Sequence, residues 1–293
     1  MTRVRSATRV RGATRVLGTA RTRGTAPPAA RLARRARAAT TTALLAAVLA
    51  ACATPSGTPG REGAGSAPAS EQTLTVLAAA SLREVFTDLA HEFEAQHEGV
   101  TVALSFAGSA DLADQLLAGS PGDVLASADT ATMDRVVEAG DATSPVAFAT
   151  NALTVVVPPG NPGGVTSFAD LARRDLTVVV CAAQVPCGAA TARVEAAAGT
   201  TVHRASEEAS VTDVLAKVTA DEADAGLVYV TDAALAGDDV EVVEVPETTT
   251  VVSTYPIAVT SGPASPALAR QWLDLVTGPV GQAALAEAGF GPP

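Results

Sequence analysis

The chain has 293 residues and is acidic, with 20 lysines and arginines against 31 aspartates and glutamates. Eleven of the basic residues are arginines within residues 1–51, which contain no acid, so the net charge from Cys52 onward is −22. A surface of this charge argues against nucleic acid as a partner. It also does not attract anions over a distance, so any bound anion must be held by local donors.

Residues 1–51 have the pattern of a signal peptide with a long basic N-terminal region. The apolar stretch over residues 38–51 has 14 residues, which is too short to span a bilayer as a helix but suits a signal-peptide core. It ends in Leu-Ala-Ala-Cys52, which resembles the lipobox of bacterial lipoproteins and predicts lipidation of Cys52. The alternative is an ordinary export signal that is cleaved elsewhere. Arg34-Arg35 permits a twin-arginine route, and the long basic region permits translation to start at a later codon.

Residues 52–72 are predicted to form the lipidated cysteine and a flexible linker. In the stretch 53–72, 16 of 20 residues are Gly, Pro, Ser, Thr or Ala, a composition that cannot bury enough apolar surface to order itself. We expect an extracytoplasmic protein that is attached to the cell membrane through its lipid only.

Two further cysteines, Cys181 and Cys187, are six residues apart. In an oxidising compartment they can pair as a disulfide; two free thiols or a pair of metal ligands are the alternatives. The three histidines, at positions 91, 97 and 203, do not have the spacing of metal ligands. We therefore expect no cationic metal site and no cofactor.

From residue 73 the pattern alternates between strands and helices. The expected strands and helices of the first half follow in chain order: strand 73–79, helix 82–96, strand 100–106, helix 109–119, strand 123–128 and helix 130–140. Such alternation predicts an α/β fold with a mainly parallel sheet that helices cover on both faces.

A second α/β set starts after Asn151. Its expected elements are strand 153–160, a short helix in 167–175, strand 176–183, helix 188–199, helix 211–223, strand 226–230 and strand 240–245. The chain then passes through 248–260, where Pro256 suggests an edge or crossing strand, and ends in helices within 265–278 and 279–290. Two similar units with a late return segment suggest two lobes, a hinge and a cleft between them.

Neutral donors are the candidate functional groups of this body. It contains no G-x-S-x-G, P-loop or G-x-G-x-x-G motif. Instead, predicted helices open beside Ser81, Ser109, Cys187 and Val211, where backbone N–H groups lack partners and can bind an anion. A structural role is the alternative for each serine, because Ser81 and Glu84 match a capping box and Ser109 matches an N-cap.

Six segments together resemble the molybdate-binding proteins of ABC transporters. They are TLTVLAAASL, SFAGSADLADQL, PGDVLASADTATMD, QVPCGAATARV, EASVTDVLAKV and AGLVYVTDA, and they follow the family's order across residues 73–293. The resemblance implies a two-lobed periplasmic-binding-protein fold of type II, with the ligand cleft between lobes joined by a two-stranded hinge. We place lobe I at residues 73–151 plus 253–293 and lobe II at residues 152–252.

The resemblance also implies the ligand-binding residues. Ser81 and Ser109 match serines that donate hydroxyl and backbone N–H groups, Cys187 and Val211 match backbone N–H donors, and Tyr229 matches a hydroxyl donor. Cys187 stands where the family commonly has alanine, which costs nothing if only the amide is used. Nearby acidic residues, Glu208 or Asp213, could adjust the site.

The expected function is binding of molybdate, and of tungstate, outside the cytoplasmic membrane and delivery to the permease subunits of an ABC transporter. The protein is expected to be a monomer and not an enzyme. The alternatives are a receptor for sulfate or another small oxyanion, a secreted serine hydrolase that uses Ser81 or Ser109, and a structural surface lipoprotein.

Overall fold

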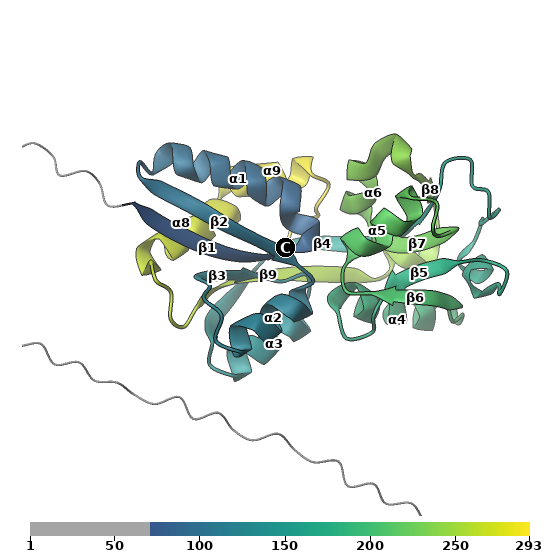
Figure 1. Ribbon diagram of the computed structural model, residues 1–293, viewed down its shortest axis with the longest axis horizontal. Coiled ribbons are helices and arrows are strands. Elements are labelled where there is room, and N and C mark those ends of the chain that lie inside the picture. The colour runs from purple at the N-terminus through teal and green to yellow at the C-terminus, as the bar shows by residue number, and fades with distance from the viewer. Residues whose placement is uncertain (1–70) are drawn as a thin grey trace, which may run out of the picture. The chain divides into compact units, whose positions relative to one another are not determined.

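The computed structural model describes residues 71–293, so the predicted signal peptide, the lipidation of Cys52 and nearly all of the linker lie outside the described residues. The described body holds one nine-stranded sheet in the order β2-β1-β3-β9-β4-β7-β5-β6, with β8 paired to β4. Figure 1 shows two α/β halves, which we call lobe I and lobe II, connected by β4 and β9.

Lobe I contains three parallel strands, the return strand β9 and five helices. The strands are β1 (Gln72–Ala79), β2 (Val100–Ala107), β3 (Val124–Ala126) and β9 (Val252–Thr260). The helices are α1 (Arg83–Gln96), α2 (Ser109–Leu117), α3 (Thr130–Glu138), α8 (Pro266–Thr277) and α9 (Pro279–Glu287), and the short 3₁₀ helix η1 (Ala80–Leu82) precedes α1. The apolar face of α1 packs on α8, where Phe86 and Phe93 each meet the ring of Trp272 edge-on at 5.6 Å. Burial of these aromatic rings is the main source of stability at this contact.

Lobe II contains the remaining strands and helices. The strands are β5 (Val178–Cys181), β6 (Arg204–Glu208), β7 (Ala225–Tyr229) and β8 (Glu241–Val243). The helices are α4 (Pro186–Ala198), α5 (Val211–Thr219), α6 (Val230–Ala236) and α7 (Pro246–Thr249), with 3₁₀ helices η2 (Phe168–Ala172) and η3 (Gly237–Asp239). α5 buries Val211, Val214 and Val218, and because they recur at helical spacing, one face of the helix packs against the sheet.

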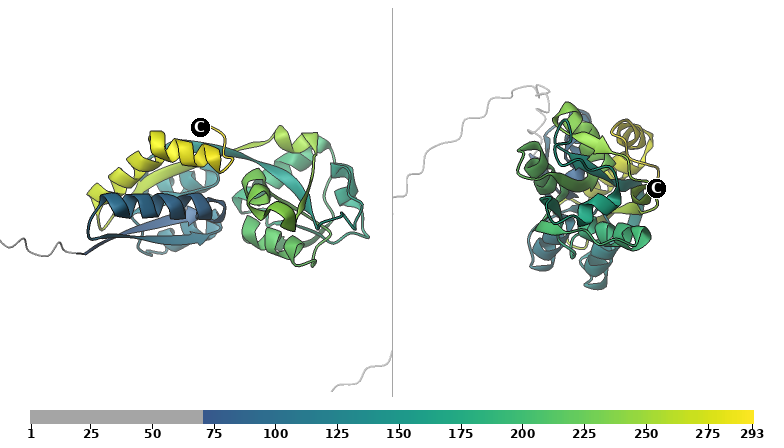
Figure 2. Two further views of the ribbon diagram at one scale, coloured as in Figure 1. Left: turned by 90° about the horizontal axis from the view of Figure 1, so that it is seen from above. Right: turned by 90° about the vertical axis from the view of Figure 1, so that its right-hand side faces the viewer.

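The long strand β4 (Ala142–Val157) belongs to both lobes. It pairs with β9 as far as Ala152 and with β7 from Leu153 onward. Figure 2 shows these ribbons bridging the lobes in the view from above. β4 therefore changes partner between Ala152 and Leu153, and we propose that lobe I and lobe II divide near this point.

The sheet is less uniformly parallel than the alternation predicts. The pairings among β1, β2 and β3 and among β5, β6 and β7 are parallel. Every pairing made by β4 or β9 is antiparallel. β9 is a crossing strand but not an edge, because it lies between β3 and β4. Pro256 is tolerated there because it stands opposite Ala147, at a register shift of the β4 ladder.

Candidate functional site

A small cavity lies between the two lobes. Thirteen residues line it: Ala79, Ala80, Ser81, Gly108, Ser109 and Ala128 from lobe I, and Val185, Pro186, Cys187, Ala209, Ser210, Val211 and Tyr229 from lobe II. The structure thus brings together all five predicted ligand-binding residues. The centre of a water-sized sphere can move within about 20 Å³ of this cavity, so in the described arrangement it suits an ion of a few atoms rather than a sugar or a peptide.

Three α-helices begin at the cavity. α2 starts with Ser109, α5 starts with Val211, and Cys187 is the second residue of α4. The first N–H groups of a helix have no acceptor within it, and the helix dipole adds roughly half a positive charge at that end. Because these ends come from both lobes and line one cavity, their N–H groups can serve one anion jointly.

Ser81 lies inside the 3₁₀ helix η1 and does not cap α1. Leu82 is the residue before α1, and among the described residues no side chain accepts a hydrogen bond at that end. The capping box of Ser81 with Glu84, which was the structural alternative, therefore does not form. The 3₁₀ turn places Ser81 one residue too far from the helix for capping. Its hydroxyl instead contacts the hydroxyl of Tyr255 on β9, at an O···O distance of 3.0 Å.

Ser109 is not the N-cap of α2, which was the structural alternative for this residue. Gly108 occupies the cap position and Ser109 is the first helical residue. Its Oγ accepts a hydrogen bond from the Ala128 N–H at 3.0 Å, and the side chain is buried. Because the oxygen already accepts, the hydroxyl proton is free to point to a further acceptor such as an anion.

Tyr229 ends β7 with a buried hydroxyl that has no hydrogen-bond partner. The residue is 1 % exposed, and among the described residues no group has hydrogen-bond geometry to its Oη. Burial raises the pKa of the phenol well above its usual value, which the nearby Ser253 and Tyr255 hydroxyls only partly offset. The phenol therefore stays protonated, and its O–H is a donor in need of an acceptor.

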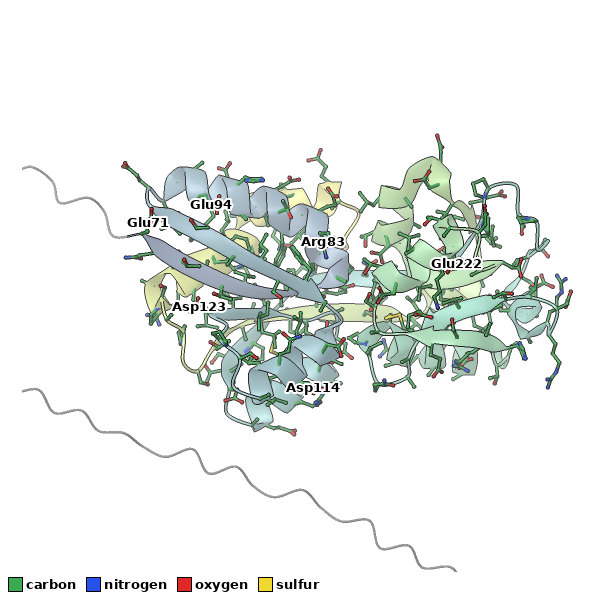
Figure 3. The ribbon with its side chains drawn as sticks, viewed as in Figure 1. Glu71, Arg83, Glu94, Asp114, Asp123 and Glu222 are labelled. Atoms are coloured by element: carbon green, nitrogen blue, oxygen red, sulfur yellow. A yellow bond between two sulfur atoms is a disulfide. The ribbon has the colours of Figure 1, made fainter. Side chains whose placement is uncertain are left out.

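Cys187 is held by a disulfide to Cys181, with a Cα–Cα distance of 5.6 Å; the bond is drawn in yellow in Figure 3. It joins the end of β5 to the first turn of α4. The loop is tight, because a Cβ on Gly188 would lie 1.9 Å from the carbonyl oxygen of Ala182. Disulfide and glycine together fix where the Cys187 N–H lies relative to the cavity.

Ser210 lines the cavity, although the sequence analysis does not predict it as a site residue. It is the N-cap of α5: its Oγ accepts from the Asp213 N–H at 3.2 Å and contacts the Asp213 carboxylate at 2.7 Å. The pattern Ser210-x-x-Asp213 is a capping-box signal, so the sequence contained the clue. Because the hydroxyl proton goes to Asp213, this hydroxyl is not free for a ligand.

The acidic residues suggested as modifiers of the site are engaged elsewhere. Glu208 pairs with Lys217, and hydrogen bonds from Lys217 and Ser206 hold the pKa of its carboxyl below the usual value. Asp213 is bound by Ser210. Neither carboxylate lines the cavity, so neither contacts a ligand there directly.

The cavity contains no charged side chain among its lining residues. Figure 3 shows labelled acidic side chains, such as Glu94 on α1, Asp114 on α2 and Glu222 after α5, on other parts of the two lobes. Within residues 71–293, no cluster of three or more His, Cys, Asp and Glu is arranged to hold a metal ion.

The described part of the chain also has no helix long and apolar enough to cross a membrane.

One buried carboxyl group is bonded to the backbone of Tyr229, a residue that lines the cavity. Asp232 in the first turn of α6 accepts the Tyr229 N–H at 3.0 Å. The residue is 5 % exposed, and burial raises the pKa of its carboxyl to about 7, although the hydrogen bond from the Tyr229 N–H opposes the shift.

The chain is similar to known extracellular solute-binding proteins in sequence. Residues 74–291 match the family described as bacterial extracellular solute-binding protein. The chain is 49% identical over 223 residues to the "Molybdate-binding protein ModA" of Mycobacterium tuberculosis, which covers 76% of this chain and 85% of that protein.

Two solved structures share the fold. The periplasmic molybdate-binding protein of Azotobacter vinelandii matches with a TM-score of 0.61 and 24% identity over 75% of this chain and 99% of its own. The sulfate-binding protein SubI of Mycobacterium tuberculosis matches with a TM-score of 0.66 and 21% identity over 75% of this chain and 86% of its own. The fold alone is thus common to receptors of different oxyanions, whereas the identity to the ModA relative is far higher. The chain belongs to the bacterial extracellular solute-binding proteins and, within them, to the ModA family.

Proposed function

We propose that this protein binds molybdate, and tungstate equally, in the cavity between its lobes. The observation that carries the proposal is the convergence of neutral donors from both lobes on one small cavity: Ser81 and Ser109 from lobe I, and Cys187, Val211 and Tyr229 from lobe II. The 49% identity to a mycobacterial molybdate-binding protein supports molybdate as the ion.

The chemistry of the donors fits a tetrahedral dianion. Each hydrogen bond to a charged acceptor contributes about 1.5–3 kcal/mol, and the helix ends add favourable potential without a cation. Amides and hydroxyls only donate to the ligand here, so a protonated oxyanion would turn its own O–H toward donors. The site should therefore reject protonated phosphate, and it should distinguish sulfate from molybdate by size.

The second part of the proposal is delivery of the bound anion to a membrane transporter, which the family membership supports. We propose that ligand contacts from both lobes hold the cleft closed, and that the closed monomer is presented to the permease of an ABC transporter. We further propose that Cys52 carries the lipid that keeps the protein on the outer side of the cell membrane.

The hydrolase alternative receives no support from the contacts of the two serines. Ser81 contacts a phenol and Ser109 contacts a backbone amide, so neither hydroxyl has a histidine or carboxylate as a general base among the described residues. We accordingly propose a binding protein without catalytic activity or cofactor.

Isothermal titration calorimetry of the protein with molybdate, tungstate, sulfate and phosphate tests the proposal. We expect similar tight binding of molybdate and tungstate and much weaker binding of the other two. Equal affinity for sulfate would indicate a general oxyanion receptor. No heat with any oxyanion, together with an unchanged melting temperature in their presence, would favour a structural lipoprotein.

A further inference from the structure

The backbones of the two lobes approach each other closely beside the cavity. Gly108 of lobe I, between β2 and α2, faces Ala209 of lobe II, between β6 and α5. A Cβ atom placed on Gly108 would lie 2.3 Å from the Ala209 carbonyl oxygen and 3.4 Å from its carbonyl carbon. The obstacle is a backbone group, so no side-chain rotation can relieve the overlap.

The backbone conformation of Gly108 does not itself require glycine. Its φ of −58° and ψ of 136° are allowed for every L-residue. Gly119 and Gly140, by contrast, have φ of 88° and 85°, where a side chain is strained in any environment. A side chain at position 108 is therefore excluded by lack of space and not by backbone strain, because the backbone of lobe II occupies that space.

This overlap exists only when the lobes are together. Because Gly108 and Ala209 belong to different lobes, opening the hinge separates them and leaves room for a side chain. Substitution at Gly108 should therefore leave folding of each lobe unaffected and oppose the closed arrangement alone.

We propose that the Gly108–Ala209 contact is the stop that sets how far the lobes close around the anion, an inference that rests on the proposed function of the cavity. Both residues line the cavity, and each is followed by the start of a helix, α2 at Ser109 and α5 at Val211. The distance between the two backbones thus sets the distance between donor groups on opposite sides of the ligand.

A methyl group at position 108 would hold the backbones apart. An ordinary C···O contact is about 3.3–3.6 Å, so the lobes would have to separate by roughly 1 Å at this point. Hydrogen bonds weaken steeply beyond their normal length, so an ion held by lobe I would lose at least one good bond from lobe II. Since such a bond to an anion contributes about 1.5–3 kcal/mol, the expected loss of affinity is about tenfold to a hundredfold.

The test compares Gly108→Ala with the matched control Gly262→Ala. Among the described residues, no atom lies within 4 Å of a Cβ added to Gly262, and its φ is not positive, so it receives the same methyl group in open space. Molybdate affinity is measured by calorimetry, and closure by the ligand-induced decrease in radius of gyration in small-angle X-ray scattering. We expect Gly108→Ala to bind at least about tenfold more weakly and to compact less, whereas Gly262→Ala behaves as the wild type.

Three outcomes would overturn the stop. One is wild-type affinity and compaction in Gly108→Ala. Another is the same loss in Gly262→Ala. A third is a large drop in the melting temperature of ligand-free Gly108→Ala, because an obstacle between closed lobes cannot destabilise the open protein. Failure of the wild type to bind molybdate would instead reject the proposed ligand, and the same pair of variants would then be compared with sulfate, the other oxyanion considered for the cavity.

Discussion

Tyr229 combines full burial with a hydroxyl that lacks a protein partner. Such a group costs about 1–3 kcal/mol in the ligand-free closed protein and becomes a good donor once an anion is present. Removing it should therefore act in opposite directions on stability and binding.

For Tyr229→Phe we expect the free energy of unfolding without ligand to be unchanged or raised by about 1 kcal/mol. Molybdate affinity should fall at least about tenfold. Chemical denaturation and calorimetry measure the two quantities. Unchanged affinity would remove Tyr229 from the set of ligand donors.

The Ser81 hydroxyl and the Tyr255 hydroxyl form a chain toward the cavity. Tyr255 is fully buried, and burial raises the pKa of its phenol well above the usual value, so it keeps its proton. If Tyr255 donates to Ser81 at 3.0 Å, the Ser81 proton is turned toward the ligand, and the two bonds strengthen each other.

A double-mutant cycle tests this coupling. Ser81→Ala should weaken molybdate binding about tenfold or more, and Tyr255→Phe about threefold to tenfold. In the Ser81→Ala background, Tyr255→Phe should cost little more, because its effect passes through Ser81. Additive losses, measured by calorimetry on the four proteins, would show that Tyr255 acts independently.

At the scale of single elements, the start of α4 depends on the Cys181–Cys187 disulfide. The bridge closes a short loop, for which loop-closure entropy predicts about 2 kcal/mol of stabilisation. The Cys187 N–H belongs to the backbone and survives removal of the sulfur.

The variant Cys181→Ala/Cys187→Ala should therefore lose about 2 kcal/mol of unfolding free energy, while molybdate affinity falls less than about tenfold. Denaturation curves and calorimetry give both values, and the reduced wild-type protein serves as a second comparison. Complete loss of binding in a folded variant would mean that the disulfide itself, and not the amide, makes the site.

The first turn of α6 carries a carboxyl that resists ionisation. Burial raises the pKa of Asp232 to about 7 from the ordinary value of 3.8, so the folded state holds this proton more tightly than the unfolded state does. The free energy of unfolding should then fall as pH rises from about 4 to 7 and level off above.

The variant Asp232→Asn isolates this contribution, since the amide oxygen can still accept the Tyr229 N–H. Between pH 5 and pH 8, the stability of the wild type relative to the variant should fall by on the order of 2 kcal/mol. Asp170 and Glu208, whose carboxyl pKa values are lowered, do not titrate in this range. A constant difference between the two proteins would contradict the assignment.

Local sequence patterns predicted most of the strands and helices of the two lobes. The segments that they did not predict have physical reasons. The β6 strand, Arg204–Glu208, has no buried residue, so it shows no apolar alternation and was missed. The first half of β4 carries Ser144 at a positive φ and two register shifts, which interrupt the strand pattern. Both segments are specified by their neighbours in the sheet rather than by their own composition.

For the site, the sequence predicted candidate residues but not all of their contacts. The resemblance to the molybdate-binding proteins placed five residues that do line one cavity. It could not find Tyr255, because that contact with Ser81 joins positions 174 residues apart. Nor could it predict the close approach of Gly108 to Ala209, because this contact depends on how the two lobes pack against each other.

At the scale of the whole molecule, the net charge opposes the ligand. The chain from Cys52 onward has a charge of −22, and within residues 71–293 no lysine or arginine lines the cavity. A dianion therefore approaches a repelling surface and is retained only by short-range donors. Dissolved salt screens the repulsion, because the Debye length shrinks from about 30 Å at 0.01 M to about 8 Å at 0.15 M ionic strength.

Molybdate binding should accordingly strengthen, by about twofold or more, between roughly 0.01 M and 0.15 M ionic strength. Calorimetry in sodium gluconate gives the cleanest measurement, because gluconate is too large for a cavity in which the centre of a water-sized sphere can move within only about 20 Å³. The same series in sodium chloride reports any competition by a small anion. A binding site built on cations would show the opposite trend, since salt would screen its attraction. Weaker binding at higher ionic strength in gluconate would therefore mean that cationic side chains, and not the amides and hydroxyls of the cleft, bring the anion in.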